Sequence, residues 1–290
     1  MAVIAVKNIS KSFGTKVALN DISFAVEQGK ICGFLGPNGA GKTTTIRLMM
    51  DFIRADTGSI SIFDLDSRVE NAKLKKAVGY SSSDLELYND WTGEEHLAFF
   101  QNIKGKTALI KDLIKRLDLD LKPKVCQLSS GNKQKLALLL AFVGNPKLLI
   151  MDEPTRGLDP LLQNTFYQIL REFKNAGGTI FLSSHNLDEV QKICDSVIVI
   201  REGKLVALES MDAIREMGVH VISLTTIQPL RLTDFKSVGV KVISHDRNTI
   251  ILKAHGDINK ILKTINHYQV KDIEITHLSL EEVFTELYRG

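Results

Sequence analysis

Cysteine is scarce in this 290-residue sequence, which contains only Cys32, Cys126 and Cys194. The three residues are far apart, odd in number and show no CxxC spacing. A disulfide framework or a zinc site needs more cysteines at closer spacings. We therefore expect reduced, buried thiols in a cytosolic protein.

A long apolar run is also missing. The longest, residues 136–144, is far too short to cross a bilayer and is stopped by Asn145-Pro146. The chain begins with alternating strand-like residues and not with a signal peptide. The sequence therefore predicts a protein that does not span a membrane, so that a role at a membrane requires a separate membrane partner.

The chain has no strong excess of one charge. Its 37 Lys and Arg residues nearly balance its 34 Asp and Glu residues, and the net charge of +3 is too small to indicate a nucleic-acid patch or a polybasic anchor. No nucleic-acid partner is expected. Apolar, charged and aromatic fractions of 44, 24 and 7% are typical of soluble globular proteins, and the length allows a second, smaller domain.

Strand-like and helix-like segments alternate up to about residue 216. This alternation predicts an α/β domain with a mainly parallel sheet, to which the N-terminal strands add an antiparallel layer. Helical patterns dominate from about residue 84 to 145, which predicts a helical subdomain. Thr92 and Glu95 form a capping box there. An apolar stripe follows at Leu109, Ile110, Leu113, Ile114 and Leu117.

Residues 217–290 show a different pattern. It predicts strands at 219–226, 240–245, 249–254 and 270–276, and helices at 232–236 and 257–267. The order βαββαβ is that of a ferredoxin-like unit, so an accessory α+β domain is expected. A last helix at 279–288 is predicted from the Ser279–Glu282 capping box.

A glycine-rich motif joins a predicted strand to a predicted helix. It matches GxxxxGK(S/T) and reads Gly36-Pro37-Asn38-Gly39-Ala40-Gly41-Lys42-Thr43. Glycines let successive backbone N–H groups turn toward a phosphate, and the helix N-terminus adds partial positive charge. Lys42 is expected to neutralise the β- and γ-phosphates, and Thr43 to offer a hydroxyl to Mg²⁺. The alternative is a glycine turn with a surface lysine.

Two carboxylates follow a second apolar strand, residues 148–151. Four apolar residues in a row suit a central parallel strand that is buried on both faces. At its end, Asp152 is expected to hold Mg²⁺ beside the glycine-rich loop, and Glu153 is the candidate general base for an attacking water. Adjacent acids in a loop are often only solvated, but this context favours the catalytic interpretation.

Four further motifs resemble those of ABC-transporter nucleotide-binding domains, in family order, over about residues 1–215. Leu128-Ser129-Ser130-Gly131-Asn132 stands where that family has its LSGGQ signature. Residues 154–159 resemble the family's D-loop, and His185 resembles its switch histidine. Phe13 matches the aromatic residue that stacks on adenine.

The resemblance implies an ATPase that binds ATP and Mg²⁺ and works as a pair, because each signature completes the site of the other subunit. The nucleotide contacts that it implies are Phe13, Gly36, Pro37, Asn38, Gly39, Ala40, Gly41, Lys42, Thr43, Thr44, Ser129, Ser130, Gly131 and Asp159. Thr43, Asp152 and Ser83 are implied at the metal, and Lys42, Glu153 and His185 in catalysis. Membrane permease subunits are implied as partners, which places the chain at the cytoplasmic face of the cell membrane.

Structural alternatives exist for single residues. Asp159 is positioned to cap a helix, with Pro160 at its first position. His185 lies just before Asn186 and Glu189, a possible capping pair. Phe13 is alternatively plain core.

The motifs depart from the family pattern in three places. Ser130 replaces the first glycine of the signature, and Asn132 replaces its final glutamine. Ser83 stands where a glutamine normally reaches the metal and water, and serine is too short to span that distance directly. A bridging water, or Asp84, is the alternative.

The segment from His277 onward resembles the ends of ATPases that serve ABC-2-type exporters. The resemblance thus implies export, with a peptide, toxin or antimicrobial peptide as the expected substrate. The alternatives are that the C-terminal unit is a generic dimerisation or regulatory appendage, and that the protein is a regulatory, weakly hydrolysing nucleotide binder.

Overall fold

The computed structural model describes residues 1–82, 86–211, 219–236, 240–255 and 258–277. The chain divides into two compact units, Met1–Leu208 and Glu209–Gly290. The sequence pattern placed this division after residue 216. The two positions differ because the pattern changes where the second sheet begins, whereas the division by packing falls within strand β10 (Lys204–Ser210).

An antiparallel sheet forms one layer of the first unit. Its strand order is β2-β1-β4-β5, with β1 (Ala2–Phe13), β2 (Lys16–Glu27), β4 (Thr57–Ile62) and β5 (Leu65–Asp66). Ile22, Phe24 and Val26 of β2 are buried while the residues between them are exposed. This period of two is the pattern of a sheet with one face packed on the core. The antiparallel layer predicted from the N-terminal strands is thus confirmed.

A six-stranded sheet forms the centre of the same unit, in the order β10-β9-β3-β8-β7-β6. Its further strands are β3 (Ile31–Leu35), β6 (Val78–Ser82), β7 (Leu148–Asp152), β8 (Thr179–Ser184) and β9 (Ser196–Arg201). The pairs β6–β7, β7–β8, β8–β3 and β3–β9 are parallel, and every residue of β3, β7 and β8 is buried. Because parallel strands end at the same edge, the segments that follow β3, β7 and β8 lie side by side.

The core of the unit joins the two sheets. Phe24 comes from the antiparallel layer, and Phe34 and Phe181 come from the central sheet. Their ring centroids lie 5.4–6.0 Å apart. Burying one such ring contributes roughly 1.5–3 kcal/mol, so this trio is a substantial part of what holds the layers together.

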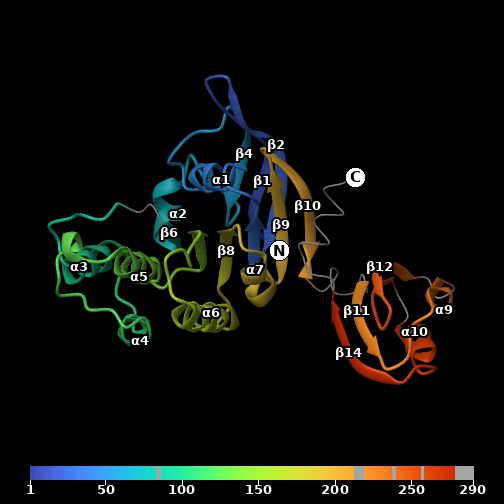
Figure 1. Ribbon diagram of the computed structural model, residues 1–290. Coiled ribbons are helices and arrows are strands. Elements are labelled where there is room, and N and C mark those ends of the chain that lie inside the picture. The colour runs from blue at the N-terminus through green and yellow to red at the C-terminus, as the bar shows by residue number, and fades with distance from the viewer. Residues whose placement is uncertain (83–85, 212–218, 237–239, 256–257, 278–290) are drawn as a thin grey trace. The chain divides into compact units, whose positions relative to one another are not determined.

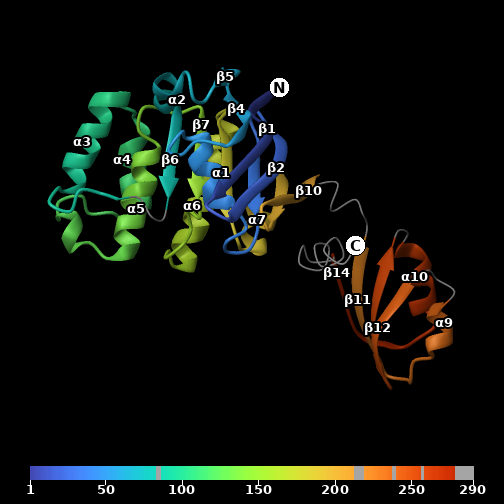
Figure 2. The same cartoon turned by 90° about the horizontal axis from the view of Figure 1, so that it is seen from above.

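The helices of the unit are α1 (Lys42–Met49), α2 (Asn71–Ala77), α3 (Gly93–Lys104), α4 (Leu109–Arg116), α5 (Ser130–Ala141), α6 (Pro160–Asn175) and α7 (Leu187–Ile193). α3, α4 and α5 gather at one side of the sheet (Figures 1 and 2). The Thr92–Glu95 capping box is confirmed, because Glu95 N–H donates to the Thr92 hydroxyl and Thr92 N–H donates to the Glu95 carboxylate. No helix among the described residues is long and apolar enough to cross a membrane.

The three cysteines have different environments. Cys32 and Cys194 are buried, and burial raises the pKa of the Cys32 thiol to about 12. Cys126 is exposed, so the prediction that all three thiols are buried was wrong. The reason is local, because Cys126 lies in a short surface 3-10 helix, η1 (Val125–Gln127), that contributes only Val125 to the interior.

The second unit has the predicted βαββαβ order. Its elements are β11 (Val219–Thr226), α9 (Leu232–Lys236), β12 (Val240–Asp246), β13 (Thr249–His255), α10 (Ile258–Ile265) and β14 (Val270–His277). The sheet order is β12-β13-β11-β14, and all neighbours are antiparallel. Leu224, Phe235, Leu252 and Ile261 belong to a separate core. The helix predicted at 279–288 lies outside the described residues.

Candidate functional site

The loop of residues 36–41 turns from the end of β3 into α1. Gly39 and Gly41 have φ angles of +81° and +113°, and Gly41 is the N-cap of α1. A Cβ at Gly36 would lie 2.3 Å from the carbonyl oxygen of Ile200. Only glycine fits these positions without strain. The loop therefore directs backbone N–H groups and the α1 N-terminus toward one point, which is a site for an anion.

Lys42 lies inside this loop. Its side chain is 5% exposed, and Nζ donates to the carbonyl oxygens of Gly36 at 2.7 Å and Pro37 at 3.2 Å. Nζ also lies 3.4 Å from Oε1 of Glu153. The ammonium is therefore held at the centre of the loop, and the alternative of a surface lysine does not apply.

A cavity of about 250 Å³ opens at this loop. Its lining residues are Phe13, Lys16, Ala18, Asn38, Gly39, Gly41, Lys42, Thr43, Thr44 and Glu153. Phe13 is the last residue of β1 and is 51% exposed, which excludes plain core packing. The cavity thus combines an aromatic ring with an anion cradle, the two features that a nucleotide requires. Lys16 and Ala18 were not identified from the sequence, because no motif marks them.

The two acids at the end of β7 have different environments. Asp152 is 3% exposed and accepts a hydrogen bond from the hydroxyl of Ser183 on the neighbouring strand β8. The same Ser183 oxygen accepts a hydrogen bond of 3.0 Å from Glu153 N–H. Asp152 is therefore not a solvated loop acid. Ser183 was not identified from the sequence, because the pairing of Asp152 with Ser183 is set by strand register.

Glu153 has a φ angle of +49°, a left-handed conformation that is uncommon outside glycine. A residue held in this region costs roughly 1–3 kcal/mol, and such strain concentrates at functional sites. Oε1 of Glu153 lies 3.4 Å from Lys42 Nζ and 3.1 Å from Nδ1 of His185. The turn at Glu153 therefore brings one carboxylate oxygen to both the lysine and the histidine.

His185 follows β8, and its side chain is 53% exposed. The next turn is fixed by Asn186, which caps α7 by accepting from the N–H groups of Asp188 and Glu189. The expected Asn186–Glu189 pair is only partly correct, because the Glu189 carboxylate instead accepts from the Ser184 hydroxyl at 2.5 Å. Burial raises the pKa of Glu189. This arrangement fixes both chain neighbours of His185.

The residues of the signature stand at a different helix N-terminus. Ser129 caps α5 by accepting from Asn132 N–H at 3.2 Å, and both Ser129 and Ser130 are exposed. A Cβ at Gly131 would lie 3.4 Å from the Gly157 carbonyl oxygen. None of these residues lines the cavity at the glycine-rich loop, and α5 lies apart from α1 in Figures 1 and 2.

The segment after Glu153 connects the signature helix to α6. The buried side-chain amide of Gln134 on α5 donates to the Pro154 carbonyl at 2.9 Å. Asp159 caps α6 by accepting from Leu162 N–H at 2.9 Å, so its structural role is observed. Ser83, expected at the metal, and its substitute Asp84 lie outside the described residues.

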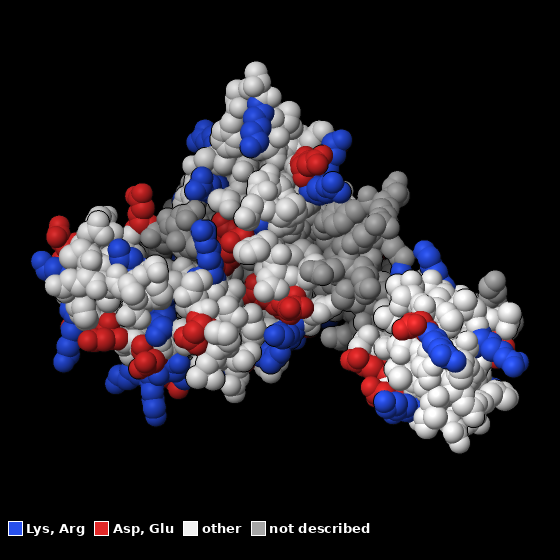
Figure 3. All heavy atoms as spheres, in the orientation of Figure 1, with Lys and Arg blue, Asp and Glu red and all other residues white. Residues whose placement is uncertain are grey.

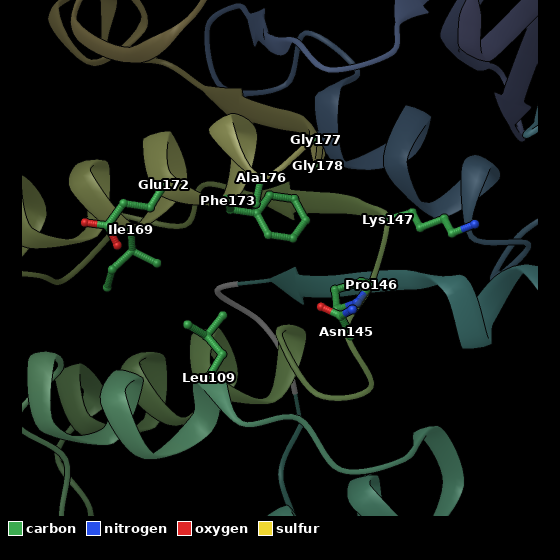
Figure 4. Close-up of a pocket in the computed structure, with 10 residues that line it drawn as sticks. All are labelled: Leu109, Asn145, Pro146, Lys147, Ile169, Glu172, Phe173, Ala176, Gly177 and Gly178. Carbon is green, nitrogen blue, oxygen red and sulfur yellow. The ribbon is translucent and has the colours of Figure 1, made fainter.

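A further cavity of about 300 Å³ lies between α4 and α6 (Figure 4). Leu109, Ile169 and Phe173 form apolar walls, while Lys147 and Gly178 immediately precede β7 and β8. It therefore lies at the amino ends of these strands. The acids, the histidine and the glycine-rich loop all follow carboxyl ends, so this cavity is separate from their site.

Sequence comparison gives the family. The family model described as "ABC transporter" matches residues 19–156, and one described as "AAA domain, putative AbiEii toxin, Type IV TA system" matches residues 124–190. Nod factor export ATP-binding protein I of Burkholderia lata is 35% identical over 83% of this chain and 82% of that protein. An uncharacterized ABC transporter ATP-binding protein of Bacillus subtilis, YdbJ, is 35% identical over 97% and 94%. The linearmycin resistance ATP-binding protein LnrL of the same species is 28% identical over 98% of both chains.

Solved structures agree with the sequence comparison. The ATP-binding subunit of an ABC transporter is 30% identical, with a TM-score of 0.68, over 74% of this chain and 92% of that chain. A dimeric ATP-binding cassette bound to ADP and Pi is 21% identical, with a TM-score of 0.66, over 72% and 98%, which shows the fold. The chain therefore belongs to the ATP-binding proteins of ABC transporters, a family of ATPases, as these relatives show together with the glycine-rich loop, its buried lysine and the acids at the end of β7.

Proposed function

We propose that the chain hydrolyses ATP to power export through separate membrane subunits. The observation that carries hydrolysis is the position of one Glu153 carboxylate oxygen, 3.4 Å from Lys42 and 3.1 Å from His185 at the edge of an anion cradle. Export is supported by a relative named for Nod factor export and by another named for linearmycin resistance. The second name supports a compound against which export gives resistance, and within that class we propose an amphipathic or antimicrobial peptide as the substrate.

Each residue of the site has a defined role in this proposal. Lys42 and the backbone N–H groups of the loop bind the β- and γ-phosphates, and Phe13 stacks on adenine. Glu153 orients the attacking water and accepts its proton, while His185 donates to the γ-phosphate. Because the His185 ring contacts the Glu153 carboxylate, both side chains would lie beside the terminal phosphate of bound ATP.

Magnesium fits the residues that are present. Mg²⁺ prefers oxygen ligands and is usually held by one or two carboxylates together with substrate phosphates. The Asp152 carboxylate at the end of β7 and the Thr43 hydroxyl at the start of α1 provide such oxygens. Bound there, the ion would neutralise charge on the phosphates.

A second copy of an ATP-binding subunit completes the site in this proposal. Ser129 and Ser130 are exposed at the N-terminus of α5 and do not line the cavity of their own chain. A helix N-terminus favours a phosphate, so the signature of one protomer would grip the nucleotide held by the other. Asp159 lies in the segment that contacts this signature. The dimeric cassette with the same fold supports this arrangement.

Membrane subunits would dock beside the helical subdomain. A cavity of about 370 Å³ there is lined by Arg47, Phe52, Tyr80, Ser82, Glu86, Phe100, Lys104 and Leu140. It borders the segment at Ser83 in the chain, and its aromatic lining suits a short helix of a permease. This docking would hold the protein at the cytoplasmic face of the cell membrane.

Turnover of ATP by the purified chain tests the proposal. We expect Glu153→Gln to reduce turnover at least about 100-fold, the usual scale for a general base, while ATP binding persists. The carboxamide keeps the shape of the side chain but cannot accept the proton. A variant that hydrolyses ATP at the original rate would remove Glu153 from this role. Binding without turnover in the unchanged chain would favour a regulatory nucleotide binder instead.

A further inference from the structure

The tip of the β1–β2 hairpin carries Phe13 to the cavity, and this tip is paired with a strand on one side only. The β1–β4 ladder ends at the pair Ser10–Thr57. Pairing with β2 shifts register on both sides of Lys11 and then continues at Ser12–Val17 and Phe13–Lys16. The last residues of β1 are therefore held by β2 on one side, and a contact from the other side would further restrict the position of the Phe13 ring.

Asp56, the residue before β4, provides that constraint. Its backbone N–H donates to the Ser10 carbonyl at 2.9 Å. Its carboxylate accepts from the Lys11 ammonium at 2.7 Å and from Ser12 N–H at 2.7 Å. These two hydrogen bonds, with that from Lys11 the larger, lower the pKa of the Asp56 carboxyl. One aspartate thus binds three consecutive residues that lead to Phe13.

Lys11 connects this aspartate to the ring. Its Nζ lies 5.5 Å from the centroid of Phe13, within the range of a cation–π contact, and its side chain is only 18% exposed. A stacked base needs one face of an aromatic ring. The cation therefore steadies the ring from one side and leaves the other available. Phe13 has few other restraints, because it is 51% exposed.

We propose that Asp56 is a positioning residue for the nucleobase, because it holds Phe13 over the phosphate cradle through Lys11 and the Ser12 backbone. This role rests on the proposed function, in which the ligand is ATP. Asp56 does not line the cavity itself. Its effect is confined to the base, since the phosphates are bound by the glycine-rich loop and Lys42.

Two ligands separate base positioning from phosphate binding. A non-hydrolysable ATP analogue, AMP-PNP, carries the base, whereas tripolyphosphate does not. By titration calorimetry with Mg²⁺, we expect Asp56→Ala to weaken AMP-PNP binding about 10-fold, since part of the stacking between the base and the Phe13 ring is lost. Tripolyphosphate binding should stay within about twofold of the unchanged chain, because no phosphate contact is altered. Asp56→Asn, which retains an acceptor for Ser12 but loses the charge, should give an intermediate loss.

Asp21→Asn is the matched control, because the Asp21 carboxylate accepts from the side chain of another β1 residue, Asn8, and no residue of the Lys11–Ser12–Phe13 tip bonds that carboxylate. It should leave both affinities unchanged. Equal weakening of both ligands by Asp56→Ala, or no weakening of AMP-PNP, would overturn the positioning role. Failure of the unchanged chain to bind AMP-PNP would instead overturn the proposed function. Thermal unfolding of each variant checks that the fold is retained.

Discussion

At the scale of single residues, the site depends on one oxygen atom. Oε1 of Glu153 faces both Lys42 and His185, and the left-handed backbone at Glu153 directs it there. A left-handed glutamate is held only where the surroundings constrain it. Part of that constraint is the hydrogen bond of 3.0 Å from Glu153 N–H to Ser183. Ser183 therefore supports the orientation of the proposed base.

Substitution of Ser183 tests this support. We expect Ser183→Ala to lower kcat about 10-fold with little change in the KM for ATP, because removing one buried hydrogen-bond partner costs about 1–3 kcal/mol. Ser183→Thr retains the hydroxyl and should recover most of the rate. Steady-state ATPase kinetics give both constants. An unchanged kcat in the alanine variant would contradict the positioning of Glu153 by Ser183.

At the scale of elements, the parallel strands and short helices place the chemical groups. β3, β7 and β8 end at one edge, so the glycine-rich loop, the two acids and His185 meet there although they are far apart in the chain. α7 then fixes the turn after His185 through Asn186 and Glu189. Burial raises the pKa of the Glu189 carboxyl, and the hydrogen bond from Ser184 offsets only part of that increase. The turn after His185 is therefore held by a residue whose protonation changes with pH.

The pH dependence of stability tests the environment of Glu189. Burial raises its pKa above the ordinary value, so the folded state binds a proton that the unfolded state has released. The folded state is thus favoured most below the unfolded pKa and loses stability as pH rises toward the folded pKa. We expect Glu189→Gln to raise Tm at pH 8, by about 2–4 °C for each kcal/mol gained, and to change it less at pH 4. Calorimetric scans of the unchanged chain and the variant at both pH values measure the change in Tm. An equal change in Tm at the two pH values would contradict the raised pKa.

At the scale of the whole molecule, the proposed site is shared between two protomers. The cradle and the signature are both helix N-termini, but only the cradle lines the cavity. Among the described residues, Lys and Arg side chains are interspersed with Asp and Glu side chains on the face that Figure 3 shows. In the proposed dimer, closure on ATP depends on the exposed end of α5.

A charge placed at Gly131 tests this dependence. We expect Gly131→Asp to prevent ATP-driven dimerisation of Glu153→Gln protein, because a carboxylate at the signature repels the phosphates of the opposite subunit. Aspartate in the first turn is favourable for a helix, so α5 should persist. Size-exclusion chromatography with saturating Mg-ATP reports the dimer, and calorimetry reports ATP binding, which should remain. Gly131→Ala is the uncharged control, and dimerisation of the aspartate variant would contradict the shared site.

Several features were predictable from the sequence because they are local. The cradle follows from glycines at fixed spacing before Lys42, and the Asp159 cap follows from Asp-Pro before a helix. The βαββαβ order of the second unit follows from alternating short apolar runs. In contrast, α2 and β6 were not predicted, since their apolar residues are few and show no clear period.

Short stretches of sequence are enough to predict the cradle, the acids and the order of elements in the second unit, because backbone geometry over a few residues depends mainly on nearby side chains. The tertiary structure alone decided which distant groups meet. Ser183 reaches Asp152 through strand register, Asp56 reaches Lys11 across a sheet, and Gln134 reaches the Pro154 carbonyl from another helix. These contacts depend on how sheets and helices pack, and packing is set by the whole core and not by any short motif.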